Sequence, residues 1–304
     1  MKEAPLFCVR EPVNSAPLDL PLTPRGAITV SFFAFFYLPK NAGEAWFLNE
    51  EERKIAFQRI QMDSSSIVNE PFVLKDALKI FTMPAAYAWL GIEICLGVPI
   101  QSVALFMPQI IGRLGYDTIK TNLYTVAPNC VGAVFLIILA FSSDLARIRF
   151  PFIATGFMLT FIGFIVYATI DVEKDLRVAY FACFMMTWGT SAPSVLLSTW
   201  YNNNIAHEGR RIALTSIGVP IANLMGLVSS NIFRNKDAPN YTPALITTAV
   251  FGMAGASLTL LLGLFMIIDN KRRDRKEGVV RRAVDVSTEK LREGTNAPEF
   301  RWFL

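Results

Sequence analysis

One carboxylic acid interrupts an otherwise apolar stretch of this chain. Glu93 lies about nine residues into the run 84–106, roughly 13 Å along a helix that rises ~1.5 Å per residue. A carboxyl group surrounded by hydrocarbon favours its neutral form, so it can take up and release a proton near neutral pH. We therefore interpret Glu93 as a candidate proton-coupling residue. The alternative is a glutamate that reaches the membrane surface or bonds to a neighbouring helix.

Uncharged polar residues recur at helical spacing in three of the apolar stretches. Gln101 shares a helical face with Glu93, Ser191 belongs to a Thr/Ser series, and Asn223 is spaced by seven residues from Ser216. Hydrocarbon offers these groups no hydrogen-bond partner, so they are expected to face other helices or a wet cavity. We interpret Gln101, Ser191 and Asn223 as substrate-binding candidates that converge with Glu93. The alternative is ordinary hydrogen bonding between packed helices.

Charged residues at two expected loop corners are candidates for a gate. They are Asp144, Arg147, Arg210 and Arg211. An acid and a base at neighbouring helix ends can hold those ends together. The alternative is that the arginines only anchor the helix ends at the membrane surface.

The elements that must position these side chains are six stretches of about 20 apolar residues, the length of a membrane-spanning helix. They lie at 84–106, 122–141, 150–170, 178–199, 212–232 and 244–268. Hydrophobic residues make up 53% of the chain and charged residues only 18%, against about 25% in soluble domains. Alternating strand patterns of about ten residues, typical of membrane barrels, are absent from the sequence. The pattern predicts an all-α integral membrane protein, with 84–268 as a six-span bundle.

Lys and Arg are distributed unequally between the two sets of loops. The loops on the side of 40–83 and 269–304 hold 20 of them, and the opposite loops hold 6. The positive-inside rule predicts that 40–83 is a cytoplasmic connector and 269–304 a cytoplasmic tail. Membrane lipid is thus an expected partner, and the basic tail needs no nucleic-acid partner to explain it.

Several classes of site find no support in the sequence. There is no nucleophile paired with a base, no Gly-rich phosphate loop and no ligand spacing that predicts a metal, so neither an enzyme nor a cofactor is expected. The cysteines Cys8, Cys95, Cys130 and Cys183 predict no disulfide or metal site. Residues 1–25 are rich in proline, contain no apolar run and are expected to be disordered.

Short motifs, taken in order along the chain, resemble one transporter family. They are Tyr37-Leu38-Pro39 with 45–53, Phe106-Met107-Pro108 with Leu114-Gly115-Tyr116, Ser143-Asp144 with Arg147, Trp200 with Gly209-Arg210-Arg211, Asn223 with Gly226, 237–241, and 296–302. Over about 26–304, this order is similar to the C-terminal half of fungal allantoate permease-like transporters. These belong to the anion:cation symporter branch of the major facilitator superfamily. The sequence departs from the pattern of this family in two places: the run Asn202-Asn203-Asn204, and the lack of a basic residue directly after Asp144.

The resemblance implies a fold and a function. It implies that 84–268 is the C-terminal six-helix bundle of a twelve-helix transporter and that 26–39 is a remnant of the sixth helix. It also implies transport of a small organic anion or vitamin-like solute, coupled to protons, at the plasma membrane. Two alternatives stay open: a fragment without transport activity, or a membrane half that associates with a full-length transporter.

Overall fold

The computed structural model describes residues 24–39, 45–63, 73–115, 117–172, 174–238, 240–280 and 294–304. The chain divides into two compact units, one ending at Met62 and one beginning at Asp63. The expected disorder of 1–25 lies outside the described residues, except for Pro24 and Arg25, which begin a helix. The predicted connector 40–83 is described only at 45–63 and 73–83.

The first unit contains two helices, α1 (Pro24–Tyr37) and α2 (Glu50–Asp63). The Trp46 indole donates a hydrogen bond to the Tyr37 carbonyl at 3.2 Å. Glu52, in the first turn of α2, accepts a hydrogen bond from the Asn49 amide at 3.0 Å. This contact satisfies one of the free N–H groups at a helix start, which explains why α2 begins where it does.

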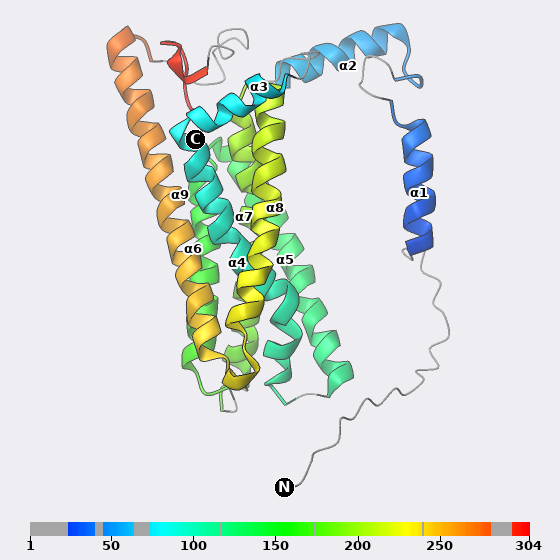
Figure 1. The fold of residues 1–304 in the computed structure, drawn as a ribbon, viewed down its shortest axis with the longest axis vertical. Helices are drawn as coiled ribbons and strands as arrows, with labels where there is room; N and C mark the ends of the chain where they lie inside the picture. Colours follow the sequence, from blue (N-terminus) through cyan, green and yellow to red (C-terminus); the bar gives the residue numbers. More distant parts are fainter. Residues whose placement is uncertain are drawn as a thin grey trace. The chain divides into compact units, whose positions relative to one another are not determined.

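The second unit is built around six long helices (Figure 1). After the short α3 (Leu74–Ala77) and a 3₁₀ turn (Leu78–Thr82) come α4 (Pro84–Gly112), α5 (Thr118–Ala146), α6 (Phe150–Thr169), α7 (Leu176–Asn203), α8 (Glu208–Ile232) and α9 (Thr242–Glu277). Each predicted apolar stretch falls on one of them, and the described residues contain no strand. The prediction of an all-α membrane fold is confirmed.

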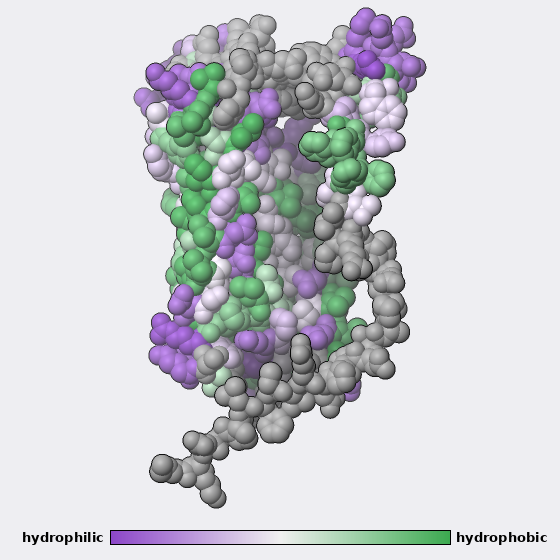
Figure 2. Space-filling view, turned by 45° about the vertical axis from the view of Figure 1, so that its right-hand side comes forward, coloured by the Kyte–Doolittle hydropathy of each residue, from purple (hydrophilic) through white to green (hydrophobic). Residues whose placement is uncertain are grey.

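Five described helices are long and apolar enough to cross a membrane: α4, α5 as Ile119–Ala146, α6, α8 and α9. The remaining long helix, α7, has 28 residues and is long enough to do the same. Its composition is more polar, because threonine and serine recur along it. Figure 2 shows hydrophobic surface along the length of the bundle and hydrophilic groups at both of its ends, with smaller hydrophilic patches between them.

Helices α6, α7 and α9 form the densely packed side of the bundle, where glycines allow backbones to approach. A Cβ atom placed on Gly189 of α7 would clash with the Thr160 hydroxyl of α6, and one on Gly255 of α9 would lie 2.5 Å from the Phe157 ring. Helices α5 and α8 are packed more loosely. In the most apolar 18-residue stretch of each helix, only 11% of α5 and 17% of α8 is buried. These two helices therefore present large apolar surfaces that the described part of the chain leaves uncovered.

Candidate functional site

The predicted polar face of α4 packs against α8, and the two helices approach most closely at Gly97. A Cβ atom at this position would lie 2.5 Å from the Ala222 carbonyl oxygen and 2.8 Å from Cγ of Met225. Only glycine fits there without moving α8. This close contact fixes the register in which the polar residues on either side of Gly97 meet α8.

One turn before Gly97, Glu93 is 6% exposed and faces Gly218 of α8. A Cβ atom on Gly218 would lie 3.5 Å from Cγ of Glu93, so the glycine leaves room beside the side chain. Among the described residues, the Glu93 carboxyl group has no ion-pair or hydrogen-bond partner. The phenol of Tyr201 on α7 lies close enough to interact with it electrostatically. Glu93 is thus a buried acid that no described residue pairs with or hydrogen-bonds.

One turn after Gly97, the structure pairs Gln101 with Asn223. The Gln101 Nε2 atom donates a hydrogen bond to Asn223 Oδ1 at 2.9 Å, and Asn223 Nδ2 donates to the Val219 carbonyl at 3.1 Å. Gly226 lies beside this pair, with its Cβ position 3.6 Å from Gln101 Oε1. Each amide nitrogen keeps a second hydrogen, so the pair can donate to an anionic group.

We call this feature the α4–α8 seam and define it by Glu93, Gly97, Gln101, Gly218 and Asn223. It brings together one buried acid and two amides along facing helix surfaces. Such a set can exchange a proton at one point and hydrogen-bond a carboxylate at another.

Ser191 lies elsewhere, on the side of α7 that faces α5. Its hydroxyl donates to the Thr187 carbonyl at 2.7 Å, within its own helix. A Cβ atom on Gly132 of α5 would lie 3.4 Å from its hydroxyl oxygen and 2.9 Å from Cγ2 of Thr187. Ser191 is therefore a contact residue of the α5–α7 pair in this structure, and no described contact joins it to the α4–α8 seam.

A buried hydroxyl group next to the seam was missed by the sequence reasoning. Ser102 bonds to Ser229 of α8 at 3.2 Å and to Thr248 of α9 at 3.3 Å, and Ser229 donates to the Val98 carbonyl at 3.0 Å. Ser102 directly follows Gln101 on α4, and Ser229 lies six residues after Asn223 on α8. Serine and threonine recur at similar depth in α4, α8 and α9, which is a signal that the sequence contains. Helical spacing, however, does not tell which of these hydroxyl groups bond to one another.

The four predicted gating residues do not form one latch. Asp144 pairs with Arg149 at 2.8 Å, whereas Arg147 ends α5 in the left-handed conformation, with φ 54°. Arg210 and Arg211 begin α8, and in the described part of the chain neither forms an ion pair. The Nε atoms of both are buried without a hydrogen-bond partner. The acid and the α8 arginines thus remain separate features, and their role in gating stays a prediction.

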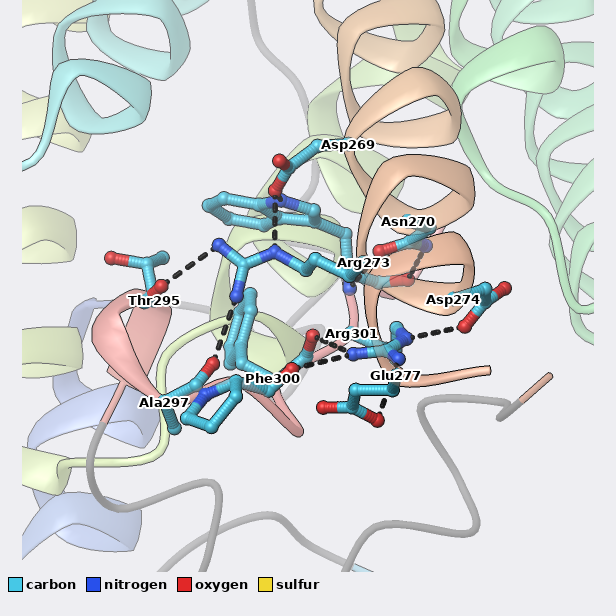
Figure 3. A network of polar contacts seen from close by, with 11 residues as sticks. Asp269, Asn270, Arg273, Asp274, Glu277, Thr295, Ala297, Phe300 and Arg301 are labelled. Carbon is cyan, nitrogen blue, oxygen red and sulfur yellow. Dashed lines mark hydrogen bonds and ion pairs between the residues drawn. The ribbon is translucent and has the colours of Figure 1, made fainter. Parts of the chain in front are cut away.

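The densest polar network lies at the end of α9, where 294–304 fold back onto the bundle (Figure 3). We call this the C-terminal clasp and define it by 294–304 with Asp269, Asn270, Arg273, Asp274 and Glu277. Arg301 is fully buried, with its Nε 2.8 Å from Asp274 and one Nη 3.1 Å from Glu277. Arg273 donates to the carbonyls of Ala297 and Thr295, both at 2.8 Å.

The same segment reaches three further helices. The Phe303 carbonyl accepts from the Trp200 indole and the Asn204 amide of α7, both at 3.0 Å, and the Leu304 carbonyl accepts from the Arg149 amide at the start of α6 at 2.7 Å. The Trp302 ring packs 6.4 Å from that of Trp89 on α4. The clasp therefore joins one end of α4, α6, α7 and α9. From the sequence, 296–302 was noted only because it resembles the same transporter family, and none of these contacts was predicted.

The described residues contain no cluster of three His, Cys, Asp or Glu side chains that could hold a metal ion. The chemistry that the α4–α8 seam supports is binding and proton exchange, since it holds no nucleophile placed beside a base.

Comparison with known proteins relates the chain to fungal transporters. It is 48% identical over 270 residues to an uncharacterized transporter of Schizosaccharomyces pombe, covering 89% of this chain and 53% of the relative. It is 43% identical to the MFS-type transporter efuF of Hormonema carpetanum, covering 86% and 53%. At 26% identity it matches the high-affinity nicotinic acid transporter of Saccharomyces cerevisiae, covering 84% and 47%.

No family model matches the chain. The chain spans about half the length of the curated relatives it matches. Its helices and these similarities identify it as a multi-pass membrane protein, homologous to fungal transporters of the major facilitator type.

Proposed function

We propose that this chain forms the C-terminal six-helix half of a major facilitator transporter, of the allantoate permease-like branch, that carries a small organic anion with protons. The observation that carries the proposal is the α4–α8 seam, where a buried, unpaired Glu93 lies two turns from the Gln101–Asn223 pair. An unpaired acid at membrane depth is costly and is typical of proton relays in transporters.

The uncovered apolar surfaces of α5 and α8 support the same proposal. In transporters built from two bundles, the substrate site lies between them near mid-membrane. The most apolar stretches of α5 and α8 are only 11% and 17% buried. Such exposed apolar surfaces are suited to contact with a second bundle and with lipid. The relatives are about twice as long as this chain, which is the length that a second bundle of similar size needs.

For the substrate, we propose a small carboxylate. One relative is named for nicotinic acid, which is an aromatic carboxylate. The free amide hydrogens of Gln101 and Asn223 suit a carboxylate oxygen, because both groups donate and neither carries a charge of its own. We place the complete transporter in the plasma membrane.

Uptake by a completed transporter, in which an N-terminal half is joined to this chain, tests the proposal. The chain is fused behind the N-terminal half of its 48%-identical relative, reconstituted into vesicles and given labelled nicotinate with a pH gradient, acidic outside. We expect uptake that other small carboxylates inhibit and that amines do not. The chain alone, which lacks the opposing bundle in this assay, is the control and should show no uptake. Uptake that is inhibited equally by amines would overturn the assignment of substrate class.

A further inference from the structure

The part of α9 beyond Ile268 has two faces of different chemistry. Its acids and amide, Asp269, Asn270, Asp274 and Glu277, all belong to the C-terminal clasp. The opposite face carries Lys271, Arg272, Arg275 and Lys276, at the i, i+1, i+4, i+5 spacing that places residues on one side of a helix.

In the described part of the chain, none of these four cations forms an ion pair with a carboxylate. None of them forms a hydrogen bond with a described residue, and all four are exposed. Together with Ile268 they line a surface hollow of about 520 Å³. On the other face, the carboxylates of Asp269, Asp274 and Glu277 bond to Arg273, Arg301 and Trp302 of the clasp, although Asp269 also interacts electrostatically with Arg272. Among the described residues, the hollow thus keeps an excess of positive charge.

An apolar stripe leads directly into this hollow. Leu261, Leu264, Phe265 and Ile268 are exposed on α9 and lie at helical spacing, and the next two turns of the same face carry the cations. Hydrocarbon chains match the first part of the stripe and phosphate oxygens match the second. The order of the two along one helix is that of an acyl chain and its headgroup at the edge of a membrane.

We propose that the hollow formed by Ile268, Lys271, Arg272, Arg275 and Lys276 binds an anionic phospholipid, with its phosphorylated headgroup against the four cations. The acyl chains lie along the stripe that ends at Ile268. The four cations extend over about 7.5 Å of helix at ~1.5 Å per residue, a length that suits a headgroup with more than one phosphate. This site is separate from the α4–α8 seam and does not depend on what the seam carries.

The test uses the full chain, purified in detergent and titrated with short-chain phosphatidylinositol 4-phosphate or phosphatidylcholine, with bound lipid counted by native mass spectrometry. We expect adducts with the phosphoinositide and at least tenfold weaker binding in K271Q/R272Q/R275Q/K276Q. The matched control, K54Q/K75Q/K120Q/K236Q, removes the same charge from exposed sites elsewhere and should bind as the unmodified chain does. Equal loss in both variants, or equal binding of phosphatidylcholine, would overturn the proposal.

A second arm separates a lipid from a free phosphate compound. Soluble inositol 1,4-bisphosphate carries the same phosphates as the lipid headgroup without acyl chains. We expect it to bind at least tenfold more weakly than the lipid, and we expect I268Q to weaken the lipid but not the soluble compound. Equal affinity for both compounds would show that the hollow binds a free phosphate and that the apolar stripe has no part.

Discussion

At the scale of single residues, the Gln101–Asn223 pair determines how the α4–α8 seam can hold an anion. Gln101 donates one hydrogen bond to Asn223 at 2.9 Å, and Asn223 in turn donates one to the Val219 carbonyl at 3.1 Å. One N–H of each amide is left over. The two side chains are thus oriented in advance, which lowers the entropy cost of binding a ligand.

Removing either amide should weaken substrate binding. A hydrogen bond contributes about 0.5–1.5 kcal/mol, so Gln101→Ala and Asn223→Ala should each raise the KM of the completed transporter about two- to tenfold. The double variant should cost less than the sum, because either change alone already breaks the pair. KM is measured from initial rates of uptake in vesicles.

Asn231→Ala is the matched control for this prediction, because its amide donates to Leu227 within the same helix α8 at 2.7 Å. Its KM should not change. Strict additivity of Gln101→Ala and Asn223→Ala would contradict the account, since it would mean that the two amides act independently.

The polar residues of the seam were predictable to different degrees. Glu93 and Gln101 were assigned to one face from their spacing, and the structure places this face against α8. Ser191 lies against Gly132 of α5. Helical spacing tells which residues share a face, but the neighbour that covers that face depends on how all six helices pack, which spacing does not contain.

At the scale of helices, Gly97 sets the distance between α4 and α8. Its Cβ position is 2.5 Å from the Ala222 carbonyl oxygen, so a methyl group there must push the backbones apart. Overpacking of this kind costs about 1–3 kcal/mol. Gly97→Ala should lower the midpoint of thermal unfolding in detergent by several degrees.

Gly91→Ala, in the same helix, adds the same methyl group where the nearest atom is Leu258 Cδ1 at 3.7 Å, an ordinary contact. Its unfolding midpoint should match that of the unmodified chain. If the two variants unfolded at the same temperature, the close approach of α4 and α8 would not be a determinant of stability.

The C-terminal clasp should stabilise the helix ends that it joins. Arg301→Met removes the buried guanidinium from Asp274 and Glu277 but keeps a long apolar side chain. Because the two carboxylates are 18% and 19% exposed, the loss should be about 1–3 kcal/mol, less than for a fully buried pair. The free energy of unfolding is followed by tryptophan fluorescence.

Arg177→Met removes an exposed arginine at the start of α7 and is the control for charge alone. It should leave the free energy of unfolding unchanged. A stability of Arg301→Met equal to that of this control would show that the clasp does not hold the helices together.

The helices were far more predictable than the clasp. A run of about 20 apolar residues predicts a spanning helix by itself, because the membrane supplies the environment that the pattern must match. α9 nevertheless continues to Glu277, nine residues past the predicted end at 268, through a charged segment. That extension is stabilised by Arg273, Arg301 and Trp302, whose partners lie more than 20 residues away along the chain.

At the scale of the whole molecule, the excess of Lys and Arg on the side of the clasp predicts that this side faces the cytoplasm. In a variant with its four cysteines replaced by serine, a cysteine at Asp237 should react with a membrane-impermeant reagent added to intact cells. A cysteine at Glu208 should react only after the membrane is opened. The reverse pattern would contradict the topology.

The central claim is that the α4–α8 seam couples a proton to solute movement through Glu93. Glu93→Gln keeps the size of the side chain but cannot ionise. Its companion control is Thr155→Ala on α6, whose hydroxyl bonds within its own helix to Pro151 at 2.8 Å. The measurement is nicotinate accumulation in vesicles holding the completed transporter, with and without an acidic exterior, alongside nicotinate exchange without a gradient. We expect Glu93→Gln to lose gradient-driven accumulation and keep exchange, and Thr155→Ala to keep both. Undiminished accumulation in Glu93→Gln would contradict the claim.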